Sequence, residues 1–234
     1  MHFHIITIFP NLFDSYLSDS MMKRAIDAGL IKVSFYNPRD FTKNKHKKVD
    51  DIPYGGGPGM VMMAQPIIDT LEKIIYSAKP NFIKRVMSEI ASSLAMTTTK
   101  KRVFKTILLS PGGKTFTTEY AKTSAQECTD IIFICGRYEG IDSRVEKITG
   151  AELVSIGDYV LTGGELAAMV MMDSISRQVK GVLGNEQSLE EERVSSHEMY
   201  TRPAELQHKG NTYKVPEVLM NGNHKEIDEW RRNH

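Results

Sequence analysis

The feature that most constrains the fold is an alternation along the chain. Short runs rich in β-branched and aromatic residues each lead into a Gly or Pro turn and then into a helical pattern. Five such runs predict strands, at 3–9, 31–36, 106–109, 130–134 and 152–156. Strands that alternate with helices favour a parallel sheet covered by helices on both faces, so the sequence predicts an α/β fold.

Three glycine-bearing loops follow successive predicted strands, at 110–113, 136–140 and 157–164. Ligands of open parallel sheets bind beyond the carboxyl ends of the strands, so three such loops predict one shared pocket. Glycines let the main chain approach a ligand closely, which suits a flat, neutral heterocycle such as adenine. Any one of these glycines, taken alone, is better explained by a tight turn.

The standard catalytic and nucleotide-binding motifs are missing. Gly113-Lys114-Thr115 resembles the end of a phosphate loop, but Leu108 stands where that loop requires glycine. The glycine-rich stretch 55–59 lacks the dinucleotide-binding spacing and does not follow a strand. Cys128 and Cys135 form no CxxC pair, so neither a zinc site nor a disulfide framework is predicted.

The sequence also predicts the compartment. No uncharged apolar run reaches the 18 or so residues that a membrane span needs. The first ten residues lack the basic start and the small-residue cleavage site of a signal peptide. With two cysteines and no disulfide pattern, we expect a reduced, soluble, cytoplasmic protein without a membrane partner.

The net charge of +1 conceals a strong asymmetry. Residues 39–48 contain five basic residues and one acidic residue, and residues 79–105 contain seven and one, so these segments carry +10 and the rest of the chain carries −9. Concentrated positive charge favours binding to phosphates. A solvated lysine-rich loop explains the composition equally well, so charge alone leaves RNA binding as one of two alternatives.

The most specific features are nine longer stretches: PRDF at 38–41, VDD at 49–51, PYGGGPGM at 53–60, CGRYEGID at 135–142, SIGDYVLTGGEL at 155–166, DSISR at 173–177, GVLG at 181–184, YTRP at 200–203 and LMNGNH at 219–224. In the family's own order and over most of the chain, these stretches resemble the bacterial TrmD family, the tRNA (guanine-N1)-methyltransferases.

The resemblance implies a SPOUT-type α/β fold, with a parallel sheet covered by helices, a C-terminal trefoil knot and a small helical C-terminal piece. We expect a SPOUT domain at 1–185 with a basic insertion at about 79–105, a mobile acidic linker at 186–199 and a short C-terminal domain at 200–234. The resemblance also implies an obligate homodimer with shared active sites. A mostly apolar helix is predicted at about 165–177, and its stretch 166–175 would then be interface, although the sequence alone equally allows monomer core.

The implied reaction is methyl transfer from S-adenosylmethionine to N1 of the tRNA guanine at position 37, which is 3′-adjacent to the anticodon. Guanine N1 carries a proton, so a carboxylate base is useful, and a guanidinium can stabilise the charge that spreads to O6. Arg177 matches the family's catalytic arginine. Glu192 stands where the family has an aspartate, followed by Arg193-Val194 instead of Ser-Phe, and Glu190 and Glu191 remain alternatives for the base.

The matched loops imply further site residues. Glu139 is expected to contact the cofactor or the guanine, and magnesium is possible, held by Glu139 or the base, with no dedicated metal cage. Asp50, Pro58 and Gly59 match guanine-recognising loops, and Arg39, Lys43 and His46 are expected near RNA phosphates. The cofactor-binding residues implied are Leu109, Ser110, Gly136, Tyr138, Ile156, Gly157, Asp158, Tyr159, Val160, Leu161, Gly163 and Gly164.

The sequence departs from the family pattern in two places that bear on the affinity for tRNA. The family usually lacks the basic insertion, and its C-terminal helical domain usually runs on beyond 234.

Two other functions are alternatives to tRNA methylation. One alternative is a SPOUT methyltransferase of ribosomal RNA, which would not need the signatures at 54–60 and Arg177 together. The other is a non-catalytic RNA-binding relative, which the altered base position favours.

Overall fold

The structure is a computed structural model that describes residues 1–78, 102–184 and 198–233. Its contacts divide the chain into two compact units, Met1–Leu183 and Gly184–His234. Most of the expected basic insertion and of the expected linker lie outside the described residues. None of the described helices is long and apolar enough to cross a membrane.

The first unit is built on a five-stranded sheet with the order β2-β1-β6-β5-β7, in which every neighbouring pair is parallel. This confirms the predicted parallel α/β architecture. The predicted strand at 130–134 is confirmed residue for residue, and all five of its residues are buried, as expected for the centre of a covered sheet. The strands are β1 His2–Ile6, β2 Lys32–Tyr36, β5 Phe104–Thr115, β6 Asp130–Ile134 and β7 Glu152–Ser155.

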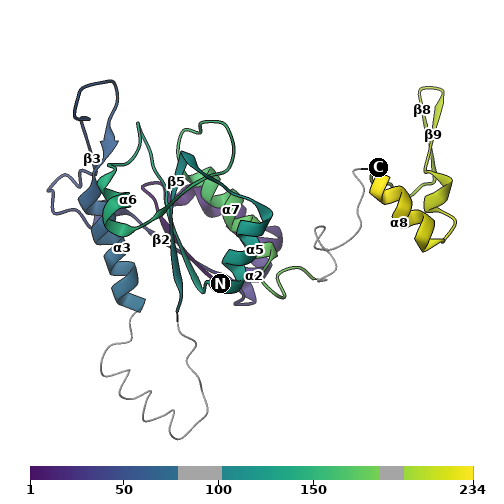
Figure 1. The fold of residues 1–234 in the computed structure, drawn as a ribbon, viewed down its shortest axis with the longest axis horizontal. Coiled ribbons are helices and arrows are strands. Elements are labelled where there is room, and N and C mark those ends of the chain that lie inside the picture. Colours follow the sequence, from purple (N-terminus) through teal and green to yellow (C-terminus); the bar gives the residue numbers. More distant parts are fainter. Residues whose placement is uncertain (79–101, 185–197, 234) are drawn as a thin grey trace, which may run out of the picture. The chain divides into compact units, whose positions relative to one another are not determined.

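Helices cover both faces of this sheet (Figure 1). One face packs against α2, α5 and α7, with Phe3, Ile5 and Phe133 pointing into that core. The other packs against α3 and α6, with Ile6, Ile132 and Ile134 facing them. The helices of this unit are α1 Asp14–Leu17, α2 Ser20–Asp27, α3 Ala64–Ala78, α5 Thr118–Glu127, α6 Arg144–Thr149 and α7 Glu165–Arg177, with the 3-10 helices η1 Pro10–Phe13 and η2 Pro38–Asp40.

The segment after β1 differs from the prediction. The apolar spacing from Leu12 to Ile26 predicts one helix capped by Asn11, but the structure has η1, α1 and α2 in succession. Asp19 interrupts the run, because its extended backbone lets its carboxylate accept a hydrogen bond from the amide of Ser20 at 2.6 Å. An aspartate in this position starts a new helix instead of continuing the old one.

The predicted turn at 110–113 is a bulge of β5 at the sheet's carboxyl edge. Leu109 and Lys114 both align with Val154 of β7, so the four residues between them loop out of the ladder. Gly113 lies against β7 so closely that a Cβ there would stand 2.5 Å from the backbone of Leu153. The bulge therefore depends on the absence of a side chain at 113.

In its described residues, the second unit contains an antiparallel hairpin, a short 3-10 helix and an α-helix. The strands are β8 Glu205–His208 and β9 Asn211–Lys214, followed by the 3-10 helix η5 Glu217–Leu219 and by α8 His224–Asn233. Ile227 of α8 is buried, and the rings of Tyr200 and Trp230 lie 6.2 Å apart. With Ile227 and Trp230 as apolar anchors, the sequence predicts a helix near 225–231, which α8 confirms, whereas the hairpin was not predicted.

We expect Gly113→Ala to lower the free energy of unfolding by about 1–3 kcal/mol, the usual cost of forcing atoms into a packed site. The added methyl group meets backbone of β7, which cannot rotate away. Gly112→Ala is the matched control, because a methyl group added there would meet nothing within 4 Å. Urea unfolding of both variants tests this, and equal midpoints would contradict it.

Candidate functional site

A pocket of about 240 Å³ lies beyond the carboxyl ends of β5, β6 and β7. Its walls are the β5 bulge, the loop after β6, and the loop between β7 and α7. The structure thus brings the three predicted glycine-bearing loops to one place. The lining residues are Leu109, Ser110, Pro111, Gly136, Arg137, Tyr138, Glu139, Gly140, Val154, Ser155, Ile156, Tyr159, Val160, Leu161, Thr162, Gly163, Gly164 and Ala167.

Ten of the twelve residues predicted for the cofactor line this pocket, together with Glu139. The two exceptions are Gly157 and Asp158, which belong to the same loop but not to the lining. The carbonyl of Gly157 instead accepts a hydrogen bond from the Ser155 hydroxyl at 2.9 Å, which shapes the turn, and Asp158 is exposed.

Glycine permits the close approach of two of these loops. The amide of Gly164 donates to the carbonyl of Gly136 at 2.9 Å. A Cβ on Gly164 would lie 2.8 Å from the Cα of Cys135, so a side chain there would push the loops apart. The constraint at Gly164 is a contact between two loops and not a local backbone angle, so a tight turn alone does not explain this glycine.

A buried ion pair lies behind the pocket. Glu165, the first residue of α7, is 1% exposed, and its Oε2 lies 2.9 Å from Nε of Arg137 without the alignment of a hydrogen bond. Its Oε1 accepts a hydrogen bond from the hydroxyl of Thr7 at 2.8 Å. The Arg137 guanidinium also lies over the ring of Phe9, 4.7 Å from its centroid. These contacts join the segments after β1 and β6 to the start of α7.

Two residues of the stretch that follows β6, Tyr138 and Cys135, differ from ordinary residues in backbone conformation and in pKa. Tyr138 has φ +60°, a left-handed conformation that is costly for a residue with a side chain and that concentrates at functional sites. Burial raises the pKa of the Cys135 thiol well above its usual value. Cys135 therefore stays protonated and is not a nucleophile.

The N-terminal glycine-rich loop adjoins the pocket through Glu139. Asp50 and Asp51 form β3 (Asp50–Asp51), which pairs with β4 (Val61–Met62). The amide of Glu139 donates to the carbonyl of Met60 at 2.9 Å, and the amide of Met62 donates to that of Gly140 at 2.9 Å. A Cβ on Gly59 would touch the Glu139 side chain at 2.6 Å. Asp50 and Gly59 are thus held beside the pocket, and the exposed Pro58 precedes Gly59.

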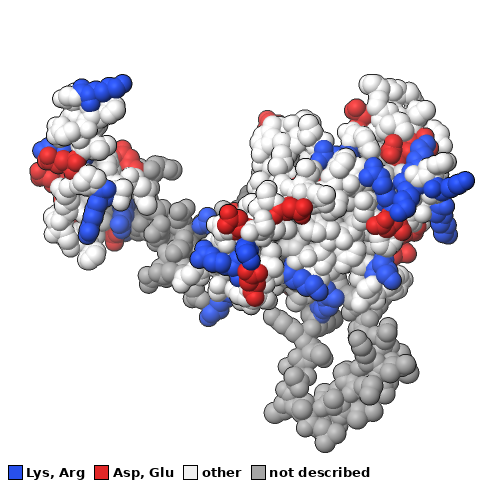
Figure 2. Space-filling model, turned by 180° about the vertical axis from the view of Figure 1, so that it is seen from behind, with Lys and Arg blue, Asp and Glu red and all other residues white. Residues whose placement is uncertain are grey.

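The predicted phosphate contacts follow β2. Arg39 lies in η2 and donates to the carbonyl of Ile8 at 3.3 Å, whereas Lys43 and His46 are exposed. Figure 2 shows basic side chains gathered, with acidic ones among them, over the part of the first unit that carries β3. Lys47 pairs with Asp40 at 3.5 Å and Lys48 with Asp51 at 3.0 Å, so acidic neighbours partly neutralise this surface.

Arg177 is not brought to the pocket of its own chain. Ala167 of α7 lines the pocket, whereas Arg177 ends that helix, ten residue steps or about 15 Å further along it. The Nε of Arg177 is buried and has no hydrogen-bond partner in the structure. The predicted base Glu192 and its alternatives, Glu190 and Glu191, lie outside the described residues.

Sequence reasoning missed Arg137, Glu165 and Thr7 as residues that shape the site. Arg137 and Glu165 stood inside the CGRYEGID and SIGDYVLTGGEL stretches, so their position was marked although their pairing was not. Thr7 carried no signal, because an isolated threonine after a strand is ordinary.

These features define an α/β protein with a pocket lined by glycine-bearing loops, placed where open parallel sheets bind ligands. A family model described as tRNA (Guanine-1)-methyltransferase TrmD matches residues 1–234. The chain therefore belongs to the TrmD family, as the sequence resemblance predicts.

Curated relatives align along nearly the whole chain. The tRNA (guanine-N(1)-)-methyltransferase of Clostridioides difficile is 48% identical over 236 residues, which cover 99% of this chain and 91% of the relative. The enzymes of the same name from Latilactobacillus sakei and Thermomicrobium roseum are 46% and 45% identical, and the alignments cover 99% of this chain and 84% and 78% of those relatives.

We expect Glu165→Gln to lower the free energy of unfolding by about 2–3 kcal/mol, because it leaves the largely buried charge of Arg137 uncompensated. Glu119→Gln is the matched control. Glu119 also lies in the first turn of a helix but is exposed, so its loss costs at most about 1 kcal/mol. Denaturant unfolding of both variants measures the difference, and equal losses would show that the ion pair contributes nothing specific.

Proposed function

We propose that this chain transfers a methyl group from S-adenosylmethionine to N1 of guanine 37 in tRNA, the base 3′-adjacent to the anticodon. Membership of the family supports the reaction class. The observation that carries the proposal to this chain is the convergence of the matched loops on one pocket, with Glu139 at its edge.

The pocket suits an adenosine group. Its glycine-bearing loops offer main-chain amides and carbonyls to a heterocycle, and Leu109, Ile156 and Leu161 offer apolar surface. When bound, S-adenosylmethionine supplies an electrophilic methyl group carried on a positively charged sulfur.

The chain's own residues have two tasks at the guanine. We assign the base to Glu192, which accepts the N1 proton so that the N1 lone pair can bond to the methyl carbon while the carbon–sulfur bond breaks. We assign Arg177 to O6, where its guanidinium stabilises the negative charge that develops as N1 loses its proton. Glu139 then contacts the cofactor or the target base at the pocket's edge.

The position of Arg177 supports a homodimer. Because α7 carries Arg177 away from its own pocket, we propose that each active site takes Arg177 from the partner chain. Leu166 and Val170 of α7 are 55% and 48% exposed, which is the apolar surface that such an interface would bury. We propose further that the C-terminal part of the α/β domain is tied in the trefoil knot of SPOUT proteins.

We propose that tRNA contacts two groups of residues. Asp50, Pro58 and Gly59, beside Glu139, would recognise the guanine, which must leave its stack to reach the cofactor. Arg39, Lys43 and His46 would lie along the phosphates. We assign residues 1–185 to the methyltransferase domain, with a basic insertion at about 79–105, and 200–234 to a C-terminal domain joined by a linker at 186–199.

The described residues do not fit a magnesium cage at the pocket. Glu139 is the only carboxylate that lines it within the described residues, and one carboxylate is too few to define a cage of protein ligands. The described group of three potential metal ligands lies elsewhere, at the amino ends of the strands. No step of the proposed mechanism therefore passes through that ion.

Substrate specificity tests the proposed function directly. The protein is incubated with S-adenosylmethionine labelled in its methyl group and with tRNA that carries guanine or adenine at position 37. We expect label in N1-methylguanine of the first tRNA and none in the second. No label in the guanine tRNA would overturn the proposal, and label only in ribosomal RNA, incubated in a parallel reaction, would favour the alternative SPOUT enzyme.

The catalytic roles are tested by substitution. We expect Arg177→Met to lower kcat by about 10²–10³, the usual loss when a donor to a developing oxyanion is removed, and to leave the Kd of the cofactor unchanged. Arg24→Met, at an exposed site on α2, is the control. We expect Glu192→Gln to lower kcat by about 10²–10⁴ and to regain activity as the pH rises, because solvent then removes the N1 proton. Full activity in Glu192→Gln, with loss in Glu190→Gln or Glu191→Gln, would move the base.

A further inference from the structure

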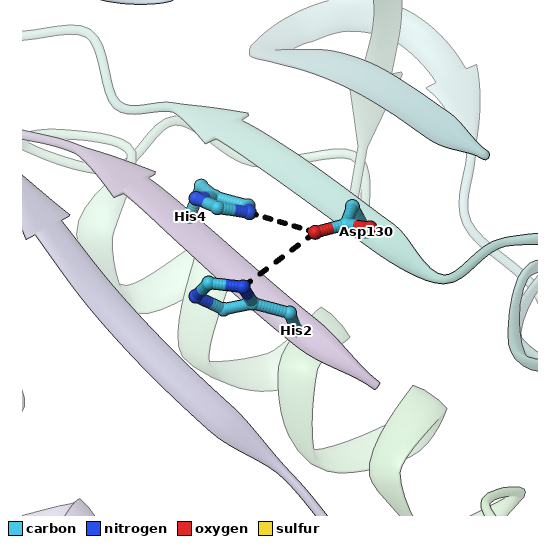
Figure 3. A group of neighbouring side chains, drawn as sticks. All are labelled: His2, His4 and Asp130. Atoms are coloured by element: carbon cyan, nitrogen blue, oxygen red, sulfur yellow. Dashed lines mark hydrogen bonds and ion pairs between the residues drawn. The ribbon is translucent and has the colours of Figure 1, made fainter. Parts of the chain in front are cut away.

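Two histidines and an aspartate form a cluster at the end of the sheet opposite the pocket. His2 and His4 alternate along β1 and so point to the same face, and Asp130 is the first residue of the neighbouring strand β6, in register with His2. Figure 3 shows both imidazoles lying against the carboxylate of Asp130. The pocket lies beyond the carboxyl ends of the strands, whereas this cluster lies at their amino ends, so the two sites are separate.

The potential ligand atoms of the cluster converge. Nε2 of His4 lies 3.0 Å and Nδ1 of His2 lies 3.5 Å from Oδ1 of Asp130, and one ligand atom from each residue lies within 4.8 Å of the others. Asp130 and His4 have side chains only 2% and 3% exposed, whereas the His2 side chain is 18% exposed. Solvent therefore reaches the cluster from the side of His2.

The atoms that face away from the centre each have a partner. Nε2 of His2 lies 2.9 Å from the hydroxyl of Ser34, and Nδ1 of His4 lies 3.1 Å from the hydroxyl of Tyr36. The hydroxyl of Thr129 donates to Oδ2 of Asp130 at 2.7 Å. Proteins orient metal-binding imidazoles and carboxylates by outer hydrogen bonds of this kind.

A cationic group already lies at the point of convergence. The guanidinium of Arg102 hydrogen-bonds both oxygens of Asp130, and its NH2 lies 3.4 Å from Nδ1 of His2 and 3.5 Å from Nε2 of His4. One positive N–H group thus faces the same three atoms that a metal ion would bind. The Arg102 side chain is 38% exposed, so it can turn out to solvent.

We propose that His2, His4 and Asp130 bind one divalent transition-metal ion of the zinc type, which displaces the guanidinium of Arg102. Two imidazoles and one carboxylate are ligands that Zn²⁺, Co²⁺ and Ni²⁺ prefer, whereas Mg²⁺ prefers oxygen ligands. The ion would hold the amino ends of β1 and β6 together and would take no part in methyl transfer.

The ionisation of the cluster agrees with this geometry. Burial and the neighbouring His4 lower the pKa of His2 to about 4, and burial lowers the pKa of His4 as well. Burial alone would raise the pKa of Asp130, but hydrogen bonds from Arg102 and His4 hold it well below its usual range. Near neutral pH the imidazoles are therefore neutral and the carboxylate is ionised, which are the forms that bind metal.

Metal uptake by the full chain tests the proposal. The protein is treated with a chelator, titrated with Co²⁺ while visible absorption is recorded, and then competed with Zn²⁺. We expect one ion per chain to produce this signal at roughly micromolar concentration, because Arg102 and Lys32 oppose the added charge. Circular dichroism of each variant verifies the fold.

Three variants sharpen the test. We expect His2→Asn to abolish uptake and His208→Asn, which removes an exposed histidine of the second unit, to leave it unchanged. We expect Arg102→Met to tighten binding at least about tenfold, or 1.4 kcal/mol, because the competing cation is gone. Equal uptake by His2→Asn and the natural chain would overturn the proposal, as would uptake by Arg102→Met alone.

Discussion

The pocket depends on the interactions of one buried carboxylate, that of Glu165, with Arg137 and Thr7. This carboxylate lies near the guanidinium of Arg137 and accepts a hydrogen bond from Thr7, so one side chain connects the segments after β1 and β6 to the start of α7. A charge 1% exposed to solvent is tolerable only when it is paired and hydrogen-bonded. These contacts therefore position the loops of the pocket. If Arg137 or Thr7 moved away, the buried carboxylate of Glu165 would lose a partner, at a cost in free energy.

Local patterns predicted the centre of the fold better than its edges. β6 and α7 matched their predicted bounds, because one is a continuous apolar run between turns and the other an apolar helix bounded by Gly164. The prediction of one helix after β1 was wrong. The apolar spacing continues across Asp19, but that residue caps the start of a new helix. The β8–β9 hairpin went unpredicted, because all its strand residues are exposed and leave no buried face to detect.

The parts of the site that are formed by short, continuous loops were predictable from the sequence. The contacts between side chains that are far apart in the sequence were not. Glycine-bearing loops on successive strands indicated a shared pocket, since the carboxyl ends of parallel strands meet at one edge. The pairs Arg137–Glu165 and His4–Asp130 join residues from different elements, and no local spacing encodes such contacts. The adjacency of Gly59 and Glu139 likewise follows from tertiary packing alone.

The geometry of α7 explains why one chain does not assemble the proposed catalytic site alone. Ten residue steps along α7 carry Arg177 about 15 Å beyond Ala167, which lines the pocket, and an arginine side chain does not span that distance. At that far end the Nε of Arg177 is buried and has no hydrogen-bond partner among the described residues. If Arg177 acts on guanine, a second chain must bring its own pocket to it, so the proposed dimer follows from the length of the helix and the proposed role of its last residue.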